Sequence, residues 1–184
     1  MAKLPVADRK PGDVGRLVGI ARRDARKAPM EVCQMGVITL DAGLLGDHKG
    51  LKYKKRAITV LALEDWRLAL REAALARGLR DGAEFERIAT LEWTTRRANL
   101  LVEGVELPKA PGGRLQIGAA VALEVTYPCQ PCRRMDEAFA GLLKAMHPDW
   151  RGGVVTKVLA GGDVAVGDRV EVTQRPARKV RRLP

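Results

Sequence analysis

The sequence predicts a mainly β protein whose strands form a closed barrel or a sandwich, with a few helices at its periphery. Two observations predict this class. Short apolar runs recur along most of the chain and are bounded by glycine-containing turns. Two helical segments interrupt these runs, and strands and helices do not alternate regularly as they would in a βαβ fold.

The clearest predicted strand covers residues 121–126, where Val121, Leu123 and Val125 alternate toward one face. Near the end of the chain, residues 161–163 read Gly-Gly-Asp and predict a turn between two strands. The other predicted strands cover residues 36–40, 56–61, 99–102, 114–117, 154–159 and 169–172. Many short strands at near-regular spacing favour a small barrel over an open sheet.

Two segments have the periodicity of a helix. The first covers about residues 64–77, with Trp66 and Leu70 on one face and Gly78 as its predicted C-terminal stop. The second begins after Cys132 and ends at the following proline, and we expect it to be a single helix. Its predicted apolar face consists of Met135, Phe139, Leu142, Leu143 and Met146.

Length and composition exclude several classes of protein. A chain of 184 residues, 46% hydrophobic and 30% charged, is typical of a folded domain and not of a disordered chain. No apolar run approaches the roughly 20 residues that cross a bilayer, and the first residues carry no apolar signal core. Three cysteines, an odd number, favour reduced thiols over a disulfide framework. We therefore predict one cytoplasmic domain, residues 1–174, with no membrane partner.

The chain is strongly basic, with 33 Lys and Arg against 22 Asp and Glu and a net charge of +11. Such a charge predicts either a nucleic-acid or membrane surface or a pocket for an anionic small molecule. Part of the excess lies in residues 175–184, a basic tail that we expect to be disordered and solvated. Aromatic residues make up 4% of the chain, which is few for a protein that stacks nucleic-acid bases. A basic enzyme with a charged tail is therefore favoured.

Residues 127–135 carry the strongest chemical signal. They place Cys129 and Cys132 in a Cys-x-x-Cys motif, flanked by prolines and followed by Arg133 and Arg134. A thiol reacts or binds metal as the thiolate, which nearby positive charge and a helix N-terminus favour. Structural zinc and a thioredoxin-like dithiol are alternatives, but a second ligand pair and a βαβ context are missing from the sequence. A single functional thiolate and an inert cysteine also remain.

Two further segments are candidates for anion binding. Residues 43–50 read Gly-Leu-Leu-Gly-Asp-His-Lys-Gly and are followed by several basic residues. Glycines let a loop turn tightly and expose N–H groups to an anion, although the pattern is also typical of an ordinary turn and lacks the Walker ending. Residues 94–104 place Arg96, Arg97 and Asn99 at a strand start, where they either bind phosphate and polar ring edges or form a solvated turn.

Taken in this order, the segments resemble the MOSC family, named for the C-terminal domain of molybdenum cofactor sulfurases. The resemblance spans roughly residues 17–172, most of the chain. No single motif is specific, but the set in this order is. The shared features are a Gly-x-x-Gly-Asp-x-x-x-Gly loop at residues 43–50, a strand led by Arg56, an Arg-x-Asn strand start at Arg97 and Asn99, and a strand with Ile-Gly and Leu-Glu-Val that leads into Pro-Cys at residues 117–132.

The resemblance implies a closed β-barrel, similar to the pyruvate kinase barrel, that carries the molybdenum cofactor (molybdopterin) or handles its sulfur. In related members that bind the cofactor, a cysteine after a barrel strand ligates molybdenum, and by position this cysteine matches Cys132. Arg97 and Asn99 match the Arg-x-Asn segment, expected near the pterin and its phosphate. Further expected cofactor contacts are Asp47, Lys49, Arg56 and Arg133.

The chain departs from the family pattern at two positions. Ala98 stands where many members have glutamate, and many members lack a cysteine at the position of Cys129. The second departure leaves open a persulfide or a disulfide with Cys132.

Three functions follow as hypotheses. In the first, the protein binds molybdopterin through Cys132 and reduces N-hydroxylated substrates, such as a base analogue or an amidoxime. Because no flavin or iron–sulfur motif is visible, a separate reductase must supply the electrons. In the second, Cys132 or Cys129 carries a persulfide received from a cysteine desulfurase. The third is a basic nucleic-acid-binding barrel, which the low aromatic content disfavours. Pyridoxal phosphate is not expected, and a homodimer is a further alternative.

Overall fold

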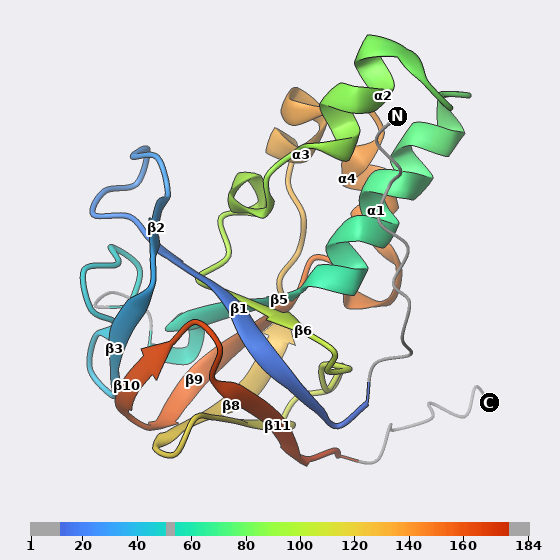
Figure 1. Cartoon of the computed structure of the whole chain (residues 1–184). Helices are drawn as coiled ribbons and strands as arrows, with labels where there is room; N and C mark the ends of the chain where they lie inside the picture. Colours follow the sequence, from blue (N-terminus) through green and yellow to red (C-terminus); the bar gives the residue numbers. More distant parts are fainter. Residues whose placement is uncertain (1–11, 51–53, 177–184) are drawn as a thin grey trace, which may run out of the picture.

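Seven strands close into a barrel in the computed structural model, which describes residues 12–50 and 54–176 (Figure 1). The order around the barrel is β1-β6-β5-β9-β8-β7-β11, and β11 pairs with β1 to close it. All neighbouring pairs are antiparallel except β5 and β6. The closed mainly β barrel that the sequence predicts is therefore confirmed. The strands are β1 (Val14–Arg22), β5 (Ile58–Ala62), β6 (Leu100–Glu103), β7 (Arg114–Ile117), β8 (Val121–Pro128), β9 (Val154–Ala160) and β11 (Arg169–Gln174).

A second, three-stranded sheet lies beside the barrel. It consists of β10 (Gly162–Ala165), β3 (Met35–Thr39) and β4 (Gly43–Leu44), while β2 (Glu31–Cys33) pairs with β1. The turn predicted at residues 161–163 is wrong, because Gly162 begins β10 and pairs with Ile38 of β3. A Cβ atom on Gly161 would lie 2.5 Å from the carbonyl oxygen of Ile38. The glycine therefore permits close strand packing and does not mark a turn.

The first predicted helix is confirmed as α1 (Leu63–Ala76), which buries Trp66 and Leu70. Gly78 follows it with a φ of +70°, and the N–H of Leu79 donates back to the carbonyl of Ala74. A second helix that the sequence did not predict, α2 (Gly82–Ala89), comes next. Together α1 and α2 connect the parallel strands β5 and β6, which form one βαβ unit within a described fold that otherwise has no regular alternation of strands and helices.

The single helix predicted after Cys132 is two short helices, α3 (Arg134–Ala138) and α4 (Leu142–Met146). The break occurs because Phe139 is extended and Gly141 has a φ of +93°. The Asp136 carboxylate accepts hydrogen bonds from the N–H groups of Gly141 and Leu143, which stabilises the start of α4. The predicted apolar face nevertheless points inward. Its buried members are Met135, Phe139, Leu142 and Met146, and Leu143 is partly buried.

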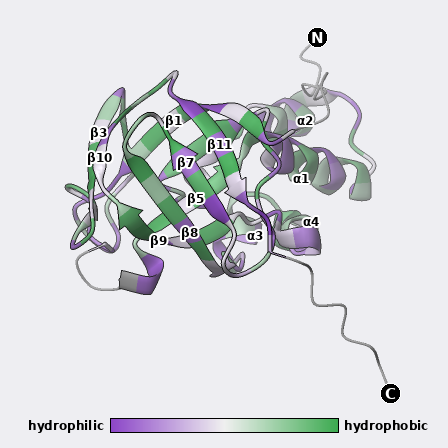
Figure 2. Cartoon of the chain, turned by 90° about the horizontal axis from the view of Figure 1, so that it is seen from below, coloured by the Kyte–Doolittle hydropathy of each residue, from purple (hydrophilic) through white to green (hydrophobic). Residues whose placement is uncertain are grey.

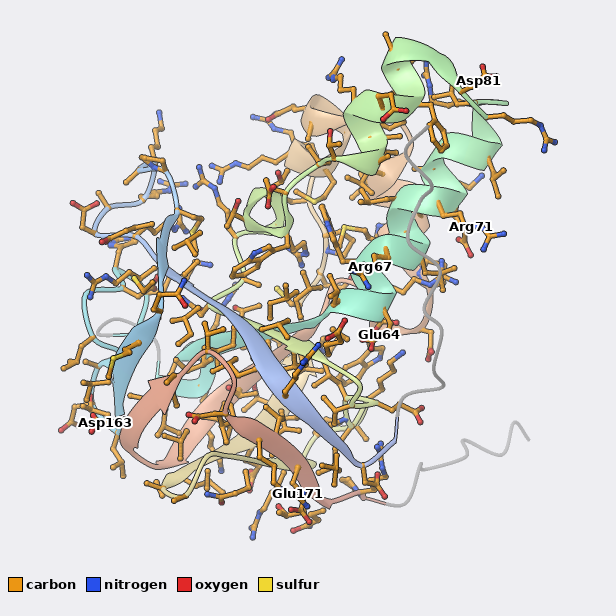
Figure 3. All side chains as sticks on the ribbon, in the orientation of Figure 1. Glu64, Arg67, Arg71, Asp81, Asp163 and Glu171 are labelled. Atoms are coloured by element: carbon orange, nitrogen blue, oxygen red, sulfur yellow. The ribbon has the colours of Figure 1, made fainter. Side chains whose placement is uncertain are left out.

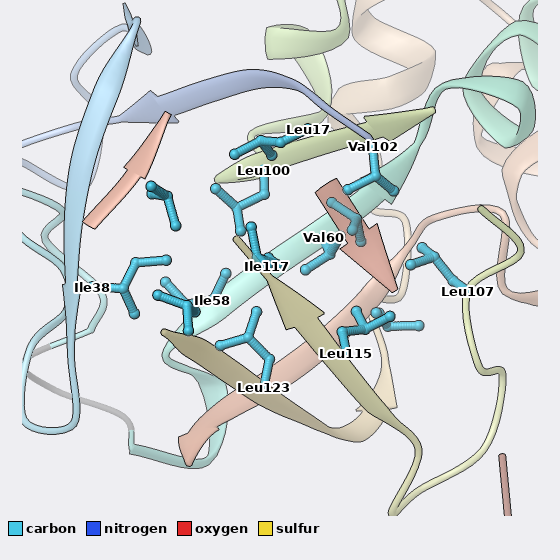
Figure 4. Packing of buried hydrophobic residues seen from close by; sticks show 14 of the residues in the cluster. Leu17, Ile38, Ile58, Val60, Leu100, Val102, Leu107, Leu115, Ile117 and Leu123 are labelled. Carbon is cyan, nitrogen blue, oxygen red and sulfur yellow. The ribbon is translucent and has the colours of Figure 1, made fainter. Parts of the chain in front are cut away.

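Two apolar cores lie on opposite faces of the barrel strands. The first fills the barrel interior, where side chains such as Ile58, Leu100 and Leu123 are fully buried (Figure 4). The second lies between the helices and the outside of β5 and β6, where Leu61 and Leu101 contact the helical layer. Figure 2 shows apolar residues concentrated in the barrel strands. Because β5 is buried on both faces, its apolar residues do not alternate with polar ones.

The start of α1 is attached to the end of β6. The carboxylate of Glu64 accepts a hydrogen bond from the N–H of Gly104 at 2.7 Å. The guanidinium of Arg67 lies 3.7 Å from the carboxylate of Glu103. Figure 3 shows Glu64 and Arg67 at the end of α1 nearest the barrel, with Asp81 at the far end of the helical layer. These contacts fix the helical layer on one side of the barrel.

Of the predicted basic tail, Arg175 and Pro176 are described, and residues 177–184 lie outside the described residues. The guanidinium of Arg175 donates to the carboxylate of Asp13 at 2.8 Å and to the carbonyl of Glu106 at 2.6 Å. The assignment of residues 1–174 to one domain stays a prediction. In the described part of the chain, no helix has the length and apolar character to span a membrane.

Candidate functional site

A cavity of about 580 Å³ lies where the loops after β1, β4 and β8 meet the segment that leads into β6. Seven of its thirteen described lining residues are Lys or Arg, and none of these thirteen is Asp or Glu. Two cysteines also line it. The lining residues are Arg23, Arg26, His48, Lys49, Arg56, Thr95, Arg96, Arg97, Cys129, Gln130, Cys132, Arg134 and Met135.

The glycine loop at residues 43–50 forms one wall of the cavity. Gly43 has a φ of +64°, in the left-handed region that glycine adopts without strain. A Cβ atom on Gly50 would lie 1.6 Å from the carbonyl oxygen of Ala42, so no larger residue fits there. The two glycines therefore let the loop fold back on itself, which brings His48 and Lys49 to the cavity.

Two buried polar side chains, Asp47 and Asn99, hold this wall from behind. The Asn99 amide donates to the Asp47 carboxylate at 3.0 Å, and its oxygen accepts from the N–H of Thr59. The Asp47 carboxylate also accepts from the backbone N–H groups of Arg23 and Lys49. Asp47 and Asn99, both expected to contact a cofactor, thus lie outside the set of lining residues. They position the backbone that carries Arg23 and Lys49.

The consecutive residues Arg96 and Arg97 have different environments. Arg97 has a φ of +59°, and this left-handed turn sends the two side chains in different directions. Arg97 lines the cavity and donates to the carbonyl of Arg26 at 3.0 Å. Arg96 is buried and fixes the cysteine segment. Its guanidinium donates to three carbonyl oxygens, those of Gly152 (3.0 Å), Cys129 (2.7 Å) and Gln130 (3.2 Å).

The two cysteines of the motif face the same cavity but differ in exposure, since Cys129 is buried and Cys132 is exposed. Cys132 lies just before α3, as predicted, and its carbonyl accepts the N–H of Met135. No three His, Cys, Asp or Glu side chains group together as metal ligands among the described residues, which include all three cysteines and both histidines. Within the described residues, Cys129 and Cys132 thus have no further such side chains grouped with them as a four-ligand structural zinc site requires.

Burial and like charge act on Lys49. Burial lowers the pKa of its ammonium group, and the nearby guanidinium groups of Arg23 and Arg56 lower it further. The negative charge of a Cys129 thiolate acts in the opposite direction. Lys49 is thus a cation held in unfavourable surroundings that an anion would improve.

Burial and neighbouring positive charges also act on two arginines, Arg23 and Arg97. Burial lowers the pKa of Arg23, and the positive charges of Arg97 and Arg134 add to this effect. The pKa of Arg97 is also lowered, first by burial and then by Arg134, while a Cys132 thiolate opposes the change. These guanidinium groups remain charged, because arginine does not lose its proton in proteins. The folded protein therefore keeps several mutually repelling cations together.

Two buried donors at the cavity have no hydrogen-bond partner among the described residues. These are the Nε groups of Arg23 and Arg56. The Arg23 side chain also donates through Nη1 to the carbonyl of Arg26, so only part of its capacity is used. Unsatisfied buried donors are rare and costly in folded proteins. An anionic oxygen in the cavity would satisfy them.

The structure brings together four of the predicted site residues, Lys49, Arg56, Arg97 and Cys132. Arg133 is not among the lining residues: its side chain is 91% exposed and lies 3.5 Å from the carboxylate of Glu137. Sequence reasoning missed three cavity cations, Arg23, Arg26 and Arg134, as separate candidates. A charged run directly after a strand would have signalled the first two, but β1 itself was not predicted.

Comparison with known proteins identifies the family. The sequence model of the MOSC domain matches residues 53–171, more than half of the chain. The chain belongs to the MOSC domain family. The resemblance read from the sequence motifs is thereby confirmed.

Solved structures similar to this MOSC protein include the YuaD protein from Bacillus subtilis, with 19% identity and a TM-score of 0.68 over 86% of this chain and 95% of that one. YiiM from Escherichia coli has 17% identity and a TM-score of 0.61, over 89% of this chain and 72% of that one. YiiM from Geobacillus stearothermophilus has 16% identity and a TM-score of 0.55, over 90% and 76%. At these identities the likeness shows the fold alone. No curated protein matches the chain significantly.

Proposed function

We propose that this MOSC protein binds the molybdenum cofactor in the basic cavity and reduces N-hydroxylated substrates with electrons from a separate reductase. One observation carries the proposal. An exposed thiol, Cys132, faces a cavity lined by seven cationic side chains and by no carboxylate among the described residues. The pterin cofactor carries a phosphate, and the MOSC family is associated with this cofactor.

The residues present fit such a group. A thiolate is a soft ligand suited to a transition metal, and Cys132 is the exposed one of the two thiols in the cavity. Lys49 and Arg56 would hold the phosphate, since phosphate oxygens can accept from the Nε of Arg56, which has no partner in the described part of the chain. Arg97 would contact the cofactor from the side of Cys132, since both residues line the same cavity.

The remaining polar residues act by positioning these groups. Asp47 and Asn99 fix the backbone of the loop that carries Lys49. Arg96 fixes the carbonyls of the segment that leads to Cys132. The bound cofactor would supply two-electron reduction, with the protein supplying binding and orientation. The sequence has no flavin or iron–sulfur motif, which supports a separate electron donor.

The test is molybdenum analysis of protein made in a host that synthesises the cofactor. We expect molybdenum in the wild type and in Cys129→Ala, and a loss of at least about tenfold in Cys132→Ala. Reduction of an N-hydroxylated base with a chemical electron donor should follow the molybdenum content. Equal molybdenum in the wild type and Cys132→Ala would sink the proposal.

A second candidate function is favoured by the presence of two thiols in one cavity. In this alternative, the Cys132 thiolate attacks the outer sulfur of a cysteine desulfurase persulfide, takes that sulfur and leaves the desulfurase cysteine as a thiol. Incubation with a desulfurase and free cysteine would then give cyanolysable sulfur on the wild type and none on Cys132→Ala. No cyanolysable sulfur on the wild type would remove this candidate.

A further inference from the structure

The cavity cations fall into two groups that differ in burial. Arg23 is 6% exposed, and Lys49 and Arg56 are half-buried; we call these three the deep group. Arg97 is half-buried, and Arg26 and Arg134 are exposed; we call these three the mouth group. The seventh cation, Arg96, belongs to neither, because its donors are bound to carbonyl groups.

The two groups interact, because the positive charges of Arg97 and Arg134 also act on Arg23. In the deep group, the charge of Lys49 interacts with those of Arg23 and Arg56, with the Asp47 carboxylate and with a Cys129 thiolate. In the mouth group, Arg97 interacts with Arg134 and with a Cys132 thiolate. The carbonyl of Arg26 joins the groups, since it accepts hydrogen bonds from both Arg23 and Arg97. The proposed metal ligand, Cys132, therefore lies with the mouth group.

The negative charge of one phosphate does not balance the positive charge of the cavity lining. The Asp47 carboxylate offsets one of the three cations of the deep group. A phosphate monoester, with about 1.5 to 2 negative charges, would roughly offset the other two. The mouth group then has no carboxylate as a counter-charge within the described lining. Like charges this close raise the free energy of the folded protein, and a second anion would lower it.

We propose that Arg26, Arg97 and Arg134 form a second anion subsite at the mouth of the cavity, and that this subsite binds a phosphate or carboxylate group of the substrate. The inference rests on the proposed function and deepens it by naming the substrate class. The substrate is an organic anion, such as an N-hydroxylated base that carries a phosphate. Guanidinium groups bind such anions in bidentate geometry, and the subsite holds the substrate beside Cys132.

The test uses inorganic phosphate as the probe and calorimetric titration of the cofactor-free wild type at low ionic strength. We expect two phosphate ions per chain. The Arg26→Gln/Arg134→Gln variant should lose one of them, with its binding weakened more than about tenfold, because charge-assisted hydrogen bonds are lost. The Lys49→Gln/Arg56→Gln variant should lose the other.

Arg133→Gln is the matched control, because Arg133 is adjacent to Arg134 but does not line the cavity. This variant should keep both phosphate ions. A single phosphate on the wild type, or two on Arg26→Gln/Arg134→Gln, would overturn the second subsite. So would an equal loss in Arg133→Gln, since the binding would then reflect diffuse positive charge.

The same phosphate chemistry could come from a cofactor that bears a second phosphate. The cofactor-loaded protein separates the two sources. If the subsite serves the substrate, loaded wild type still binds one phosphate, and Arg26→Gln/Arg134→Gln binds none. No phosphate on loaded wild type would assign the subsite to the cofactor and overturn the substrate class. Failure of the proposed function would be seen separately, in the molybdenum content of Cys132→Ala.

Discussion

The barrel interior is built from strands and the basic cavity from the segments that connect them, and the two differ in how completely their polar and apolar groups are satisfied. Leu100 and Ile58 are fully buried among other apolar side chains, so the interior needs no ligand. At the cavity, Arg23 and Arg56 each leave a buried donor without a partner among the described residues, and neighbouring cations repel one another. The difference teaches that the barrel interior supplies stability from contacts within the chain, while the cavity has buried donors and repelling cations that an anion would satisfy.

The largest effect is expected in the barrel interior. Leu100→Ala removes a fully buried side chain and should lower the free energy of unfolding by about 2–5 kcal/mol. Chemical denaturation measures this change. Leu75→Ala, at an exposed position of α1, is the control and should change it by less than about 0.5 kcal/mol. A similar small change for Leu100→Ala would contradict the account of the interior.

An intermediate effect on the free energy of unfolding is expected when Arg96 is replaced. The same replacement at Arg97 provides a comparison within the cavity wall. Arg96→Gln deprives three carbonyl groups of a charged donor and should lower the free energy of unfolding by about 1–3 kcal/mol. Arg97→Gln loses one hydrogen bond but also relieves repulsion with Arg134, so its change should stay within about 0.5 kcal/mol. Equal destabilisation by the two variants would show that Arg97 is as structural as Arg96.

The smallest effect concerns pH and Lys49. Its pKa in the folded protein is depressed below 10.5 by burial and by Arg23, so the unfolded chain binds more protons between the depressed pKa and 10.5. The charged amine thus destabilises the folded state at lower pH, and this penalty disappears as pH rises through that window. Denaturation of the wild type and Lys49→Met from neutral pH to 10.5 should show the wild type gaining stability relative to the variant. A loss of stability of the wild type relative to Lys49→Met as pH rises would contradict this prediction.

Elements with a regular apolar pattern could be predicted from the sequence. Strand β8 alternates Val121, Leu123 and Val125 into the core, and the apolar face of α1 repeats at helical spacing. Strand β1 was missed because it contains two glycines. A Cβ atom on one of them, Gly19, would lie 2.8 Å from the ring of Trp93, a contact formed only by the folded chain. Helix α2 was missed because it is short and buries Ile88 alone.

The candidate site likewise has residues that could be predicted from the sequence and residues that could not. Cys132, Lys49 and Arg97 were identified from local motifs, and the cavity brings them together. Arg23 joins them because of tertiary packing, which no local pattern records. Nor could the sequence tell which of the two consecutive arginines, both of which line the cavity, binds three backbone carbonyl groups. That choice depends on the left-handed backbone of Arg97, a conformation uncommon for residues other than glycine.

The pairing of β1 with β11 links the cavity to the folding of the whole chain. Val14 of β1 pairs with Glu171 of β11, so barrel closure joins two distant parts of the sequence, a step that is entropically costly and slow. Arg23, directly after β1, belongs to the deep group and reaches its place as β1 docks. An anion held there binds the closed barrel and not the unfolded chain. Such a ligand would therefore stabilise the closed barrel, including the pairing of β1 with β11 that is entropically costly to form.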